Sequence, residues 1–227
     1  MKQAIDYSLH QHSFLDVGSR RKSHTAYMLI MTSGCAFIRL GKAEYTVTAG
    51  NGFFIPFDCL HAVTIMPGST YNKVEFSQRL TTSICREAGF FRMTPLISAV
   101  SIELNKWLKM DKEVSLEGES GNLLRVLADQ VAKLKVNSKS TSPSLSGHHQ
   151  LCLTSLLKGD KVTDSKAIEE IAKYTGFSVK EIESCVLMRE ALKLSRSGRK
   201  VPQIAESLNT TTELLASLAI PVLGEAL

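Results

Sequence analysis

The sequence lacks the features that define several protein classes. Its five cysteines are widely spaced and form no CxxC pair, which argues against a disulfide framework and against a zinc site built from cysteines. No apolar run approaches the roughly 20 residues of a membrane-spanning helix, and the first residues lack the apolar stretch of a secretory signal. We therefore expect five reduced thiols in a cytoplasmic protein without a membrane partner.

Catalytic motifs are also missing. The chain contains no G-x-S-x-G, no P-loop and no G-x-G-x-x-G. We accordingly expect a protein that is not an enzyme and that uses no cofactor. What the chain does have is an ordinary globular composition, with 44% hydrophobic and 22% charged residues, and its 227 residues allow two domains. Its formal net charge of +5 permits a nucleic-acid partner without requiring one.

Short apolar runs separated by turn residues occupy residues 24–78. The turns include Ser33-Gly34 and Pro67-Gly68, and the runs recur every 8–12 residues or so, a spacing typical of an antiparallel sandwich or barrel. The runs are 26–31, 35–40, 44–48, 53–57, 62–66 and 70–76, with a further short strand expected at 89–93. Apolar residues then recur at helical spacing, which predicts one helix after Pro95 and a second around Leu124–Leu134.

The stretch NSKSTSPSLSGH at residues 137–148 has the composition of a flexible connector. Everything after it suggests short helices joined by tight turns, the last of them starting at a capping box of Thr210 and Glu213. We therefore predict an α+β protein with a cupin-like or jelly-roll-like antiparallel β-barrel and trailing helices over residues 1–136. A Ser-rich linker over 137–148 and an all-α domain over 149–227 complete the expected organisation.

Local motifs then point to a family. The segment Thr175–Ser178 reads TGFS, and residues 187–208 read LMREALKLSRSGRKVPQIAESL. They resemble the T-G-x-S turn and the RLxxAxxLLxxGxSVxxVAxxLG segment of the AraC/XylS family of bacterial transcription regulators. The matching positions are Leu187, Arg189, Ala191, Leu194, Gly198, Val201, Ile204, Ala205 and Leu208. Thr32–Gly34, and Ile55-Pro56 followed by His61, resemble the family's cupin-type effector domain. The resemblance implies an effector and dimerisation domain followed by a double helix-turn-helix DNA-binding domain.

The second helix-turn-helix unit departs from the family pattern. The family has a Gly-aromatic-x-Ser turn before its second recognition helix, whereas this chain has Asn209-Thr210-Thr211-Thr212. Residues 137–227 hold 11 Lys and Arg against 10 Asp and Glu, a net of +1, and residues 201–227 hold no Lys or Arg. Because attraction to phosphates needs cations, DNA binding is expected to be weak or to depend mainly on the first unit. The expected DNA-contacting residues are Ser165, Lys166, Arg189, Lys193, Arg196, Arg199, Lys200, Thr211 and Thr212.

An effector pocket is expected inside the barrel, because small barrels can hold one small ligand. The residues expected to line it are Tyr27, Phe37, Phe54, His61 and Phe76, although each could equally be ordinary core. We expect no metal, but His24 and His61 with one further ligand could still form a metal-binding triad. The leucine stripe of the second helix could pack against a second copy, giving a homodimer, or against its own barrel.

Two functions remain open from the sequence. One is a DNA-binding transcription regulator of AraC type that responds to an unknown small-molecule effector. The other is a relative with weakened or lost DNA binding that acts as a ligand-binding or partner protein. The almost complete linking motif favours the first, whereas the cation-free final helices favour the second.

Overall fold

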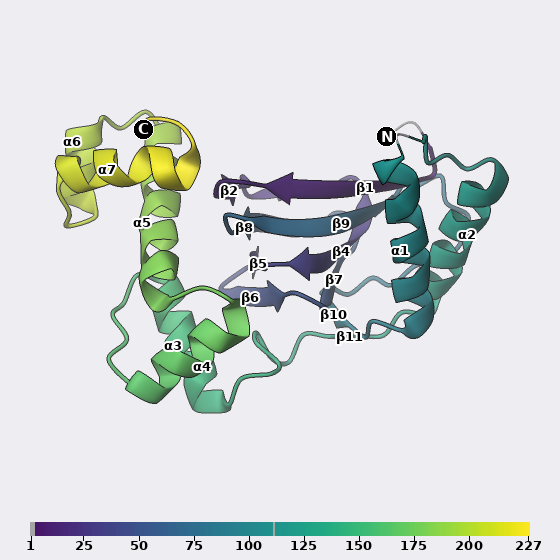
Figure 1. Ribbon diagram of the computed structural model, residues 1–227, viewed down its shortest axis with the longest axis horizontal. Helices are drawn as coiled ribbons and strands as arrows, with labels where there is room; N and C mark the ends of the chain where they lie inside the picture. The colour runs from purple at the N-terminus through teal and green to yellow at the C-terminus, as the bar shows by residue number, and fades with distance from the viewer. Residues whose placement is uncertain (1–2, 111) are drawn as a thin grey trace.

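The computed structural model describes residues 3–110 and 112–227, and its strands form two antiparallel sheets (Figure 1). The larger sheet has the strand order β1 (Ile5–His12), β9 (Ser69–Phe76), β4 (Ala26–Ser33), β7 (Gly52–Ile55), β10 (Gly89–Phe91) and β11 (Val136–Asn137). The smaller sheet has the order β2 (Asp16–Val17), β8 (Leu60–Ile65), β5 (Cys35–Leu40) and β6 (Ala43–Thr48), with β3 (Arg21–Lys22) also paired to β8.

The expected cupin-like, antiparallel architecture is confirmed, but its barrel is not closed. Over the part of the chain that the structure describes, the two sheets pair separately, so the domain is an open two-sheet sandwich. Strand β1, which the sequence did not predict, pairs with β9 over its whole length, from Ile5 opposite Phe76 to His12 opposite Ser69. The hairpin between β5 and β6 turns at Gly41-Lys42, where Gly41 has a φ of 59° that favours glycine in a two-residue turn.

Apolar side chains divide into three layers that follow the alternation of the strands. Between the sheets lie residues such as Leu29, Ile38 and Phe53. The outer face of the larger sheet is covered by α1 (Pro95–Lys109) and α2 (Gly118–Ala132). The leucine stripe of α2 therefore packs on its own sheet, the second of the two placements that the sequence left open.

The five C-terminal helices pack together, and their buried cluster continues onto the outer face of the smaller sheet (Figure 1). These are α3 (Gly147–Leu157), α4 (Ser165–Thr175), α5 (Val179–Arg196), α6 (Val201–Ser207) and α7 (Thr212–Leu223). Phe37 and Met66 of the sandwich share one buried cluster with Ile182, Met188 and other helical residues. The helices therefore pack directly on the sandwich.

The ends of these helices follow from their sequence. Ser178 caps α5 in a capping box with Glu181, and α4 ends at Gly176, whose φ is 78°. The last helix differs from expectation: Thr211, not Thr210, is the N-cap of α7, and its side chain accepts a hydrogen bond from the Leu214 amide. Among the described residues, no helix combines the length and apolar character needed to cross a membrane.

Residues 137–148, expected to be a flexible connector, lie along the sandwich. The Tyr45 hydroxyl donates to the Ser138 carbonyl at 3.1 Å, and the Thr46 amide donates to the Thr141 carbonyl at 2.8 Å. Ser142 and Leu145 are buried. Contacts with β6 thus fix a segment whose serine-rich composition is typical of linkers.

Candidate functional site

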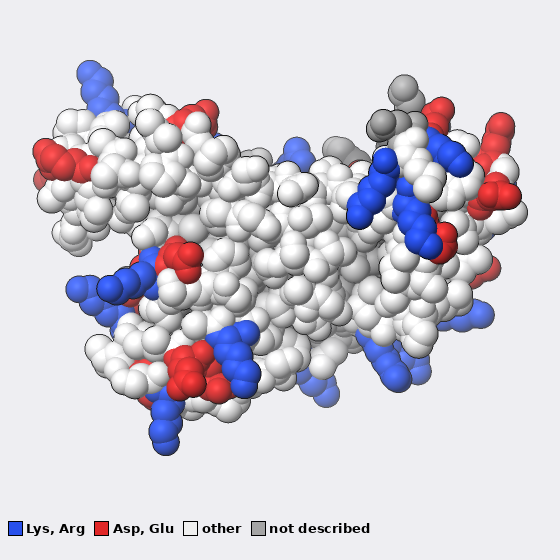
Figure 2. All heavy atoms as spheres, viewed as in Figure 1, with Lys and Arg blue, Asp and Glu red and all other residues white. Residues whose placement is uncertain are grey.

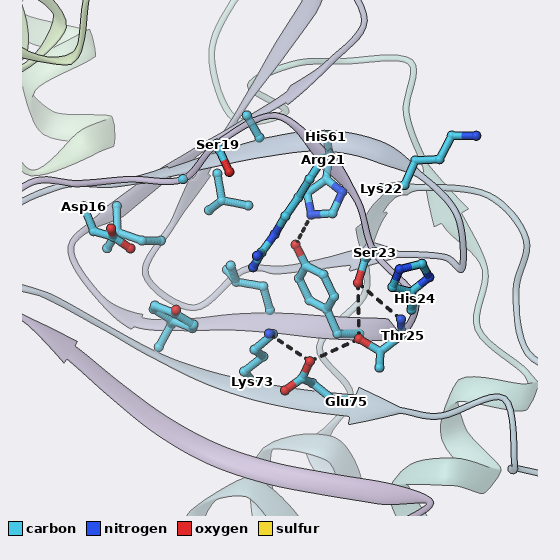
Figure 3. A pocket seen from close by; sticks show the side chains of 17 residues that line it. Asp16, Ser19, Arg21, Lys22, Ser23, His24, Thr25, His61, Lys73 and Glu75 are labelled. Atoms are coloured by element: carbon cyan, nitrogen blue, oxygen red, sulfur yellow. Dashed lines mark hydrogen bonds and ion pairs between the residues drawn. The ribbon is translucent and has the colours of Figure 1, made fainter. Parts of the chain in front are cut away.

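A cavity of about 490 Å³ opens between the two sheets at the edge where β3 pairs with β8 (Figure 3). This volume lies within the roughly 300–1,000 Å³ of small-molecule sites. The cavity is lined by β4, β8 and β9 and by the segment from Asp16 to Thr25. On β9, alternation directs Tyr71, Lys73 and Glu75 toward the cavity, whereas Val74 and Phe76 face α1 and α2.

Tyr27 and His61 form the buried centre of this cavity. The two side chains are hydrogen bonded at 2.5 Å between the Tyr27 hydroxyl and His61 Nε2. His61 Nδ1 lies 2.9 Å from the Cys59 carbonyl, which can only accept, so Nδ1 carries the hydrogen. Burial lowers the pKa of His61, and the nearby charges of Arg21 and Lys73 lower it further. The imidazole is therefore neutral, and the Tyr27 hydroxyl donates to Nε2.

The charged groups of the cavity are unevenly paired. Glu75 accepts from Lys73 Nζ at 2.9 Å and from the Thr25 hydroxyl at 3.1 Å. The same ammonium lies 4.8 Å from the centre of the Tyr27 ring, within cation–π range. Figure 3 shows the Arg21 side chain running into the cavity, whereas Lys22 points away from it. Within residues 3–110 and 112–227, no carboxylate forms an ion pair with Arg21.

The structure brings together two of the five residues that were expected to line an effector pocket. Tyr27 and His61 both line the cavity. Phe54 and Phe76 point to the opposite side of the larger sheet and pack against α1 and α2. Phe37 lies on the outer side of the smaller sheet, in the cluster formed with the C-terminal helices. The cavity is lined instead by charged and polar residues that sequence reasoning missed, namely Arg21, Lys73, Glu75 and Tyr71.

His24 also lines the cavity, at its rim beside Ser23 and Thr25 in Figure 3. Across the described ranges, no group of three or more His, Cys, Asp or Glu side chains is placed to hold a metal ion.

The residues expected to contact DNA divide into two groups. Ser165, Lys166, Arg199 and Lys200 are exposed, in or next to α4 and α6. Arg189 differs from the expectation because its side chain is only 3% exposed. Its guanidinium donates to Glu44 at 2.5 Å and to the Leu157 carbonyl at 2.8 Å, so in this arrangement it holds β6 and α3 rather than facing outward.

Other members of the expected set also have partners within the chain. Arg196 donates to the Val17 carbonyl at 2.6 Å, and Lys193 pairs with Glu190 at 2.8 Å. Thr211 caps α7, and the Thr212 hydroxyl donates to Glu213. Figure 2 shows a largely uncharged surface over α6 and α7, with both acidic and basic groups at its margins. The outer surface of α7 therefore offers little attraction to phosphates.

Comparison with known proteins gives one family match. The model of the family described as the AraC-like ligand binding domain matches residues 5–138. No curated protein matches the chain.

Solved structures of low similarity include apo ToxT from Vibrio cholerae, with a TM-score of 0.42 and 9% identity over 99% of this chain and 96% of that one. ToxT bound to an unsaturated fatty acid has a TM-score of 0.39 and 12% identity, over 100% and 95% of the two chains. A cupin superfamily protein from Desulfitobacterium hafniense has a TM-score of 0.32 and 12% identity, over 34% and 72%.

Proposed function

The chain belongs to the family with an AraC-like ligand-binding domain, and from this membership we propose that it is a ligand-responsive, AraC-type transcription regulator. In this proposal the cavity between the sheets binds a small effector, and residues 149–227 form a divergent double helix-turn-helix domain that binds double-stranded DNA. The protein works by binding rather than catalysis, in the cytoplasm and as a homodimer.

One observation supports a link between effector and DNA more than any other. The segment 16–22 lines the cavity with Asp16, Gly18 and Arg21, while the intervening Val17 faces the helices. The Val17 carbonyl accepts the hydrogen bond from Arg196 at the end of α5. Because neighbouring residues of one short segment contact both the cavity and the helices, an effector that moves Arg21 changes how α5 is held.

The chemistry of the cavity indicates the kind of effector. Arg21 is a planar donor directed into the cavity, and such a group binds carboxylates or phosphates through two parallel hydrogen bonds. Tyr27 and Leu29 supply an apolar wall beside it. We therefore favour a small molecule that carries one acidic group on an apolar or aromatic body.

DNA binding in this arrangement rests on few cations. Lys166, Arg199 and Lys200 are exposed and lie near the starts of α4 and α6. Each neutralised phosphate contributes about 0.9 to the slope of log affinity against log salt concentration. With about three such contacts per chain, we expect a slope of roughly −3 for one copy and about −5 for a dimer on two half-sites.

The test is a titration of the purified full chain with duplex DNA from upstream of its own gene, between 50 and 300 mM salt. The matched variants are Lys166→Gln, and Lys109→Gln on α1 as a control far from α4. We expect the first variant to lower the slope by about one and the control to leave it unchanged. A slope near zero for the wild-type chain would exclude the DNA-binding function.

A second function, an interaction protein with lost DNA binding, is favoured by the surface of α7. Leu214 and Ile220 are 46% and 64% exposed, and no Lys or Arg occurs within residues 201–227. Apolar exposed groups next to glutamates suit a protein surface better than a phosphate backbone. The same salt titration separates the two functions, because only the regulator binds DNA.

A further inference from the structure

A second cavity, of about 230 Å³, lies where the β5–β6 hairpin meets the C-terminal helices. From the sandwich it is lined by Arg39, Lys42 and Glu44, and from the helical side by Thr154, Leu157, Lys158, Arg189 and Glu190. It shares no residue with the cavity between the sheets. Its two walls therefore come from the two parts of the chain that the proposed regulator must couple.

Positive charge dominates this second cavity. Four cationic side chains, Arg39, Lys42, Lys158 and Arg189, line it together with only two carboxylates, which leaves a net charge of +2. Both carboxylates are already engaged: Glu44 accepts from Arg189 at 2.5 Å, and Glu190 accepts from Lys193 at 2.8 Å and from Arg189 at 3.2 Å. Concentrating like charges around a small volume is unfavourable unless an anion joins them.

The three remaining cations have no such partner. Among the described residues, no carboxylate forms an ion pair with Arg39, Lys42 or Lys158. Arg39 lies directly opposite Glu44 on the neighbouring strand, yet the Glu44 carboxylate bonds Arg189 on α5 instead. Arg39 and Lys42 on the hairpin and Lys158 at the end of α3 thus surround the cavity with unused donors.

The floor of the cavity is fixed rather than adaptable. Arg189 is 3% exposed and is held on several sides by Glu44, Glu190 and the Leu157 carbonyl. Partial burial alone would raise the pKa of Glu190, but the hydrogen bond from Lys193 and the charges of Lys193 and Arg189 lower it overall. Both carboxylates are engaged with Arg189 and keep it in place, so that the outer cations are the groups left to bind a ligand.

We propose that this cavity is a site for a small multivalent oxyanion carrying phosphate groups, bound by Arg39, Lys42 and Lys158 between the hairpin and α3. An arginine fork suits a phosphate group bidentately, and two lysines supply point charges for a second one. The cavity is smaller than a typical drug-sized site, which suits a pyrophosphate-sized group rather than a bulky effector. Such an anion joins the sandwich to the helices and stabilises their packed arrangement.

The experiment measures binding of pyrophosphate to the full chain by calorimetry, at constant ionic strength set with sodium chloride. The double variant Arg39→Gln and Lys42→Gln removes two exposed charges and no core contact. We expect its dissociation constant for pyrophosphate to rise at least tenfold. Lys109→Gln on α1 serves as the matched control and should leave that constant unchanged.

Three results would overturn the proposal. The first is wild-type protein that does not bind pyrophosphate at 10 mM, and the second is a double variant that binds it as tightly as wild type. The third is duplex DNA that displaces pyrophosphate while the double variant loses DNA affinity to the same degree, because the cations would then serve the DNA backbone. Loss of pyrophosphate binding with unchanged DNA affinity supports the site, and it does so whether or not the chain regulates transcription.

Discussion

Replacing Glu44 with glutamine tests the contact that joins the sandwich to the helices. The substitution keeps the shape of the side chain and removes the charge that faces Arg189 on α5. Glu44 Oε1 lies 2.5 Å from an Nη atom of Arg189, and the side chains of Glu44 and Arg189 are 14% and 3% exposed. Because solvent screens so little of this pair, the loss of one partner leaves a buried guanidinium without its main counter-charge.

The size of the expected loss in unfolding free energy depends on the partners that Arg189 keeps in the variant. Breaking a buried pair by removing one partner costs about 3–5 kcal/mol. Arg189 keeps Glu190 at 3.2 Å and the Leu157 carbonyl at 2.8 Å, so we expect a smaller loss than that range, about 2–3 kcal/mol. In a chain of 227 residues this corresponds to a fall in melting temperature of roughly 4–12 °C.

The assay is urea unfolding followed by far-UV circular dichroism, with Glu103→Gln as the control. Glu103 pairs with Lys106 on the exposed surface of α1, where both side chains are more than half exposed, and surface pairs contribute about 0–1 kcal/mol. The reasoning fails if Glu44→Gln costs no more than this control. The double variant Glu44→Gln with Arg189→Met should recover part of the loss, because it leaves no buried charge unpaired.

Two further outcomes follow from local structure. Burial lowers the pKa of His61 in the folded state. As the pH decreases below ~6.5, the imidazole is therefore protonated more readily in the unfolded chain than in the folded one, and the free energy of unfolding decreases. When the pH is lowered from 7.5 to 5, the urea midpoint should therefore decrease less for His61→Gln than for wild type. An equal decrease in both proteins would refute this. Gly34→Ala should cost at least ~1 kcal/mol, because φ is 71° and an added Cβ meets Ser69; an unchanged midpoint would contradict it.

The elements that alternation or helical spacing marks strongly were predictable from the sequence. The expected strands from residue 26 onward match β4 to β10 closely, and the capping role of Ser178 is confirmed. Strand β1 was missed because its inward face carries Asp6, Ser8, His10 and His12, which resemble a polar, exposed segment. In the folded chain His10 and His12 stack on Tyr71. This strand can be recognised only from its pairing with β9, which the sequence alone does not reveal.

The cavity between the sheets was harder to predict for a related reason. Alternation says which residues share a face of a strand, but not which face is turned to the cavity. Both sheets here pack on their outer sides against helices, so central strands such as β4 and β7 bury both of their faces over most of their length. Phe54 and Phe76 therefore looked like pocket residues while packing on α1 and α2. Lys73 and Glu75, which the sequence did not single out as pocket residues, point inward.

Arg189 and Arg196 make contacts within the chain, and these contacts affect how strongly DNA binding should depend on salt concentration. Both side chains occupy positions expected to contact phosphates, yet in the packed arrangement they bind Glu44 and the Val17 carbonyl. Phosphate contacts must then come from other exposed cations, such as Lys166, Arg199 and Lys200. If the helices leave the sandwich, both guanidinium groups are released and about two more phosphates can be neutralised per chain. A slope steeper by about two in the Glu44→Gln variant would therefore show that the sandwich restrains DNA binding.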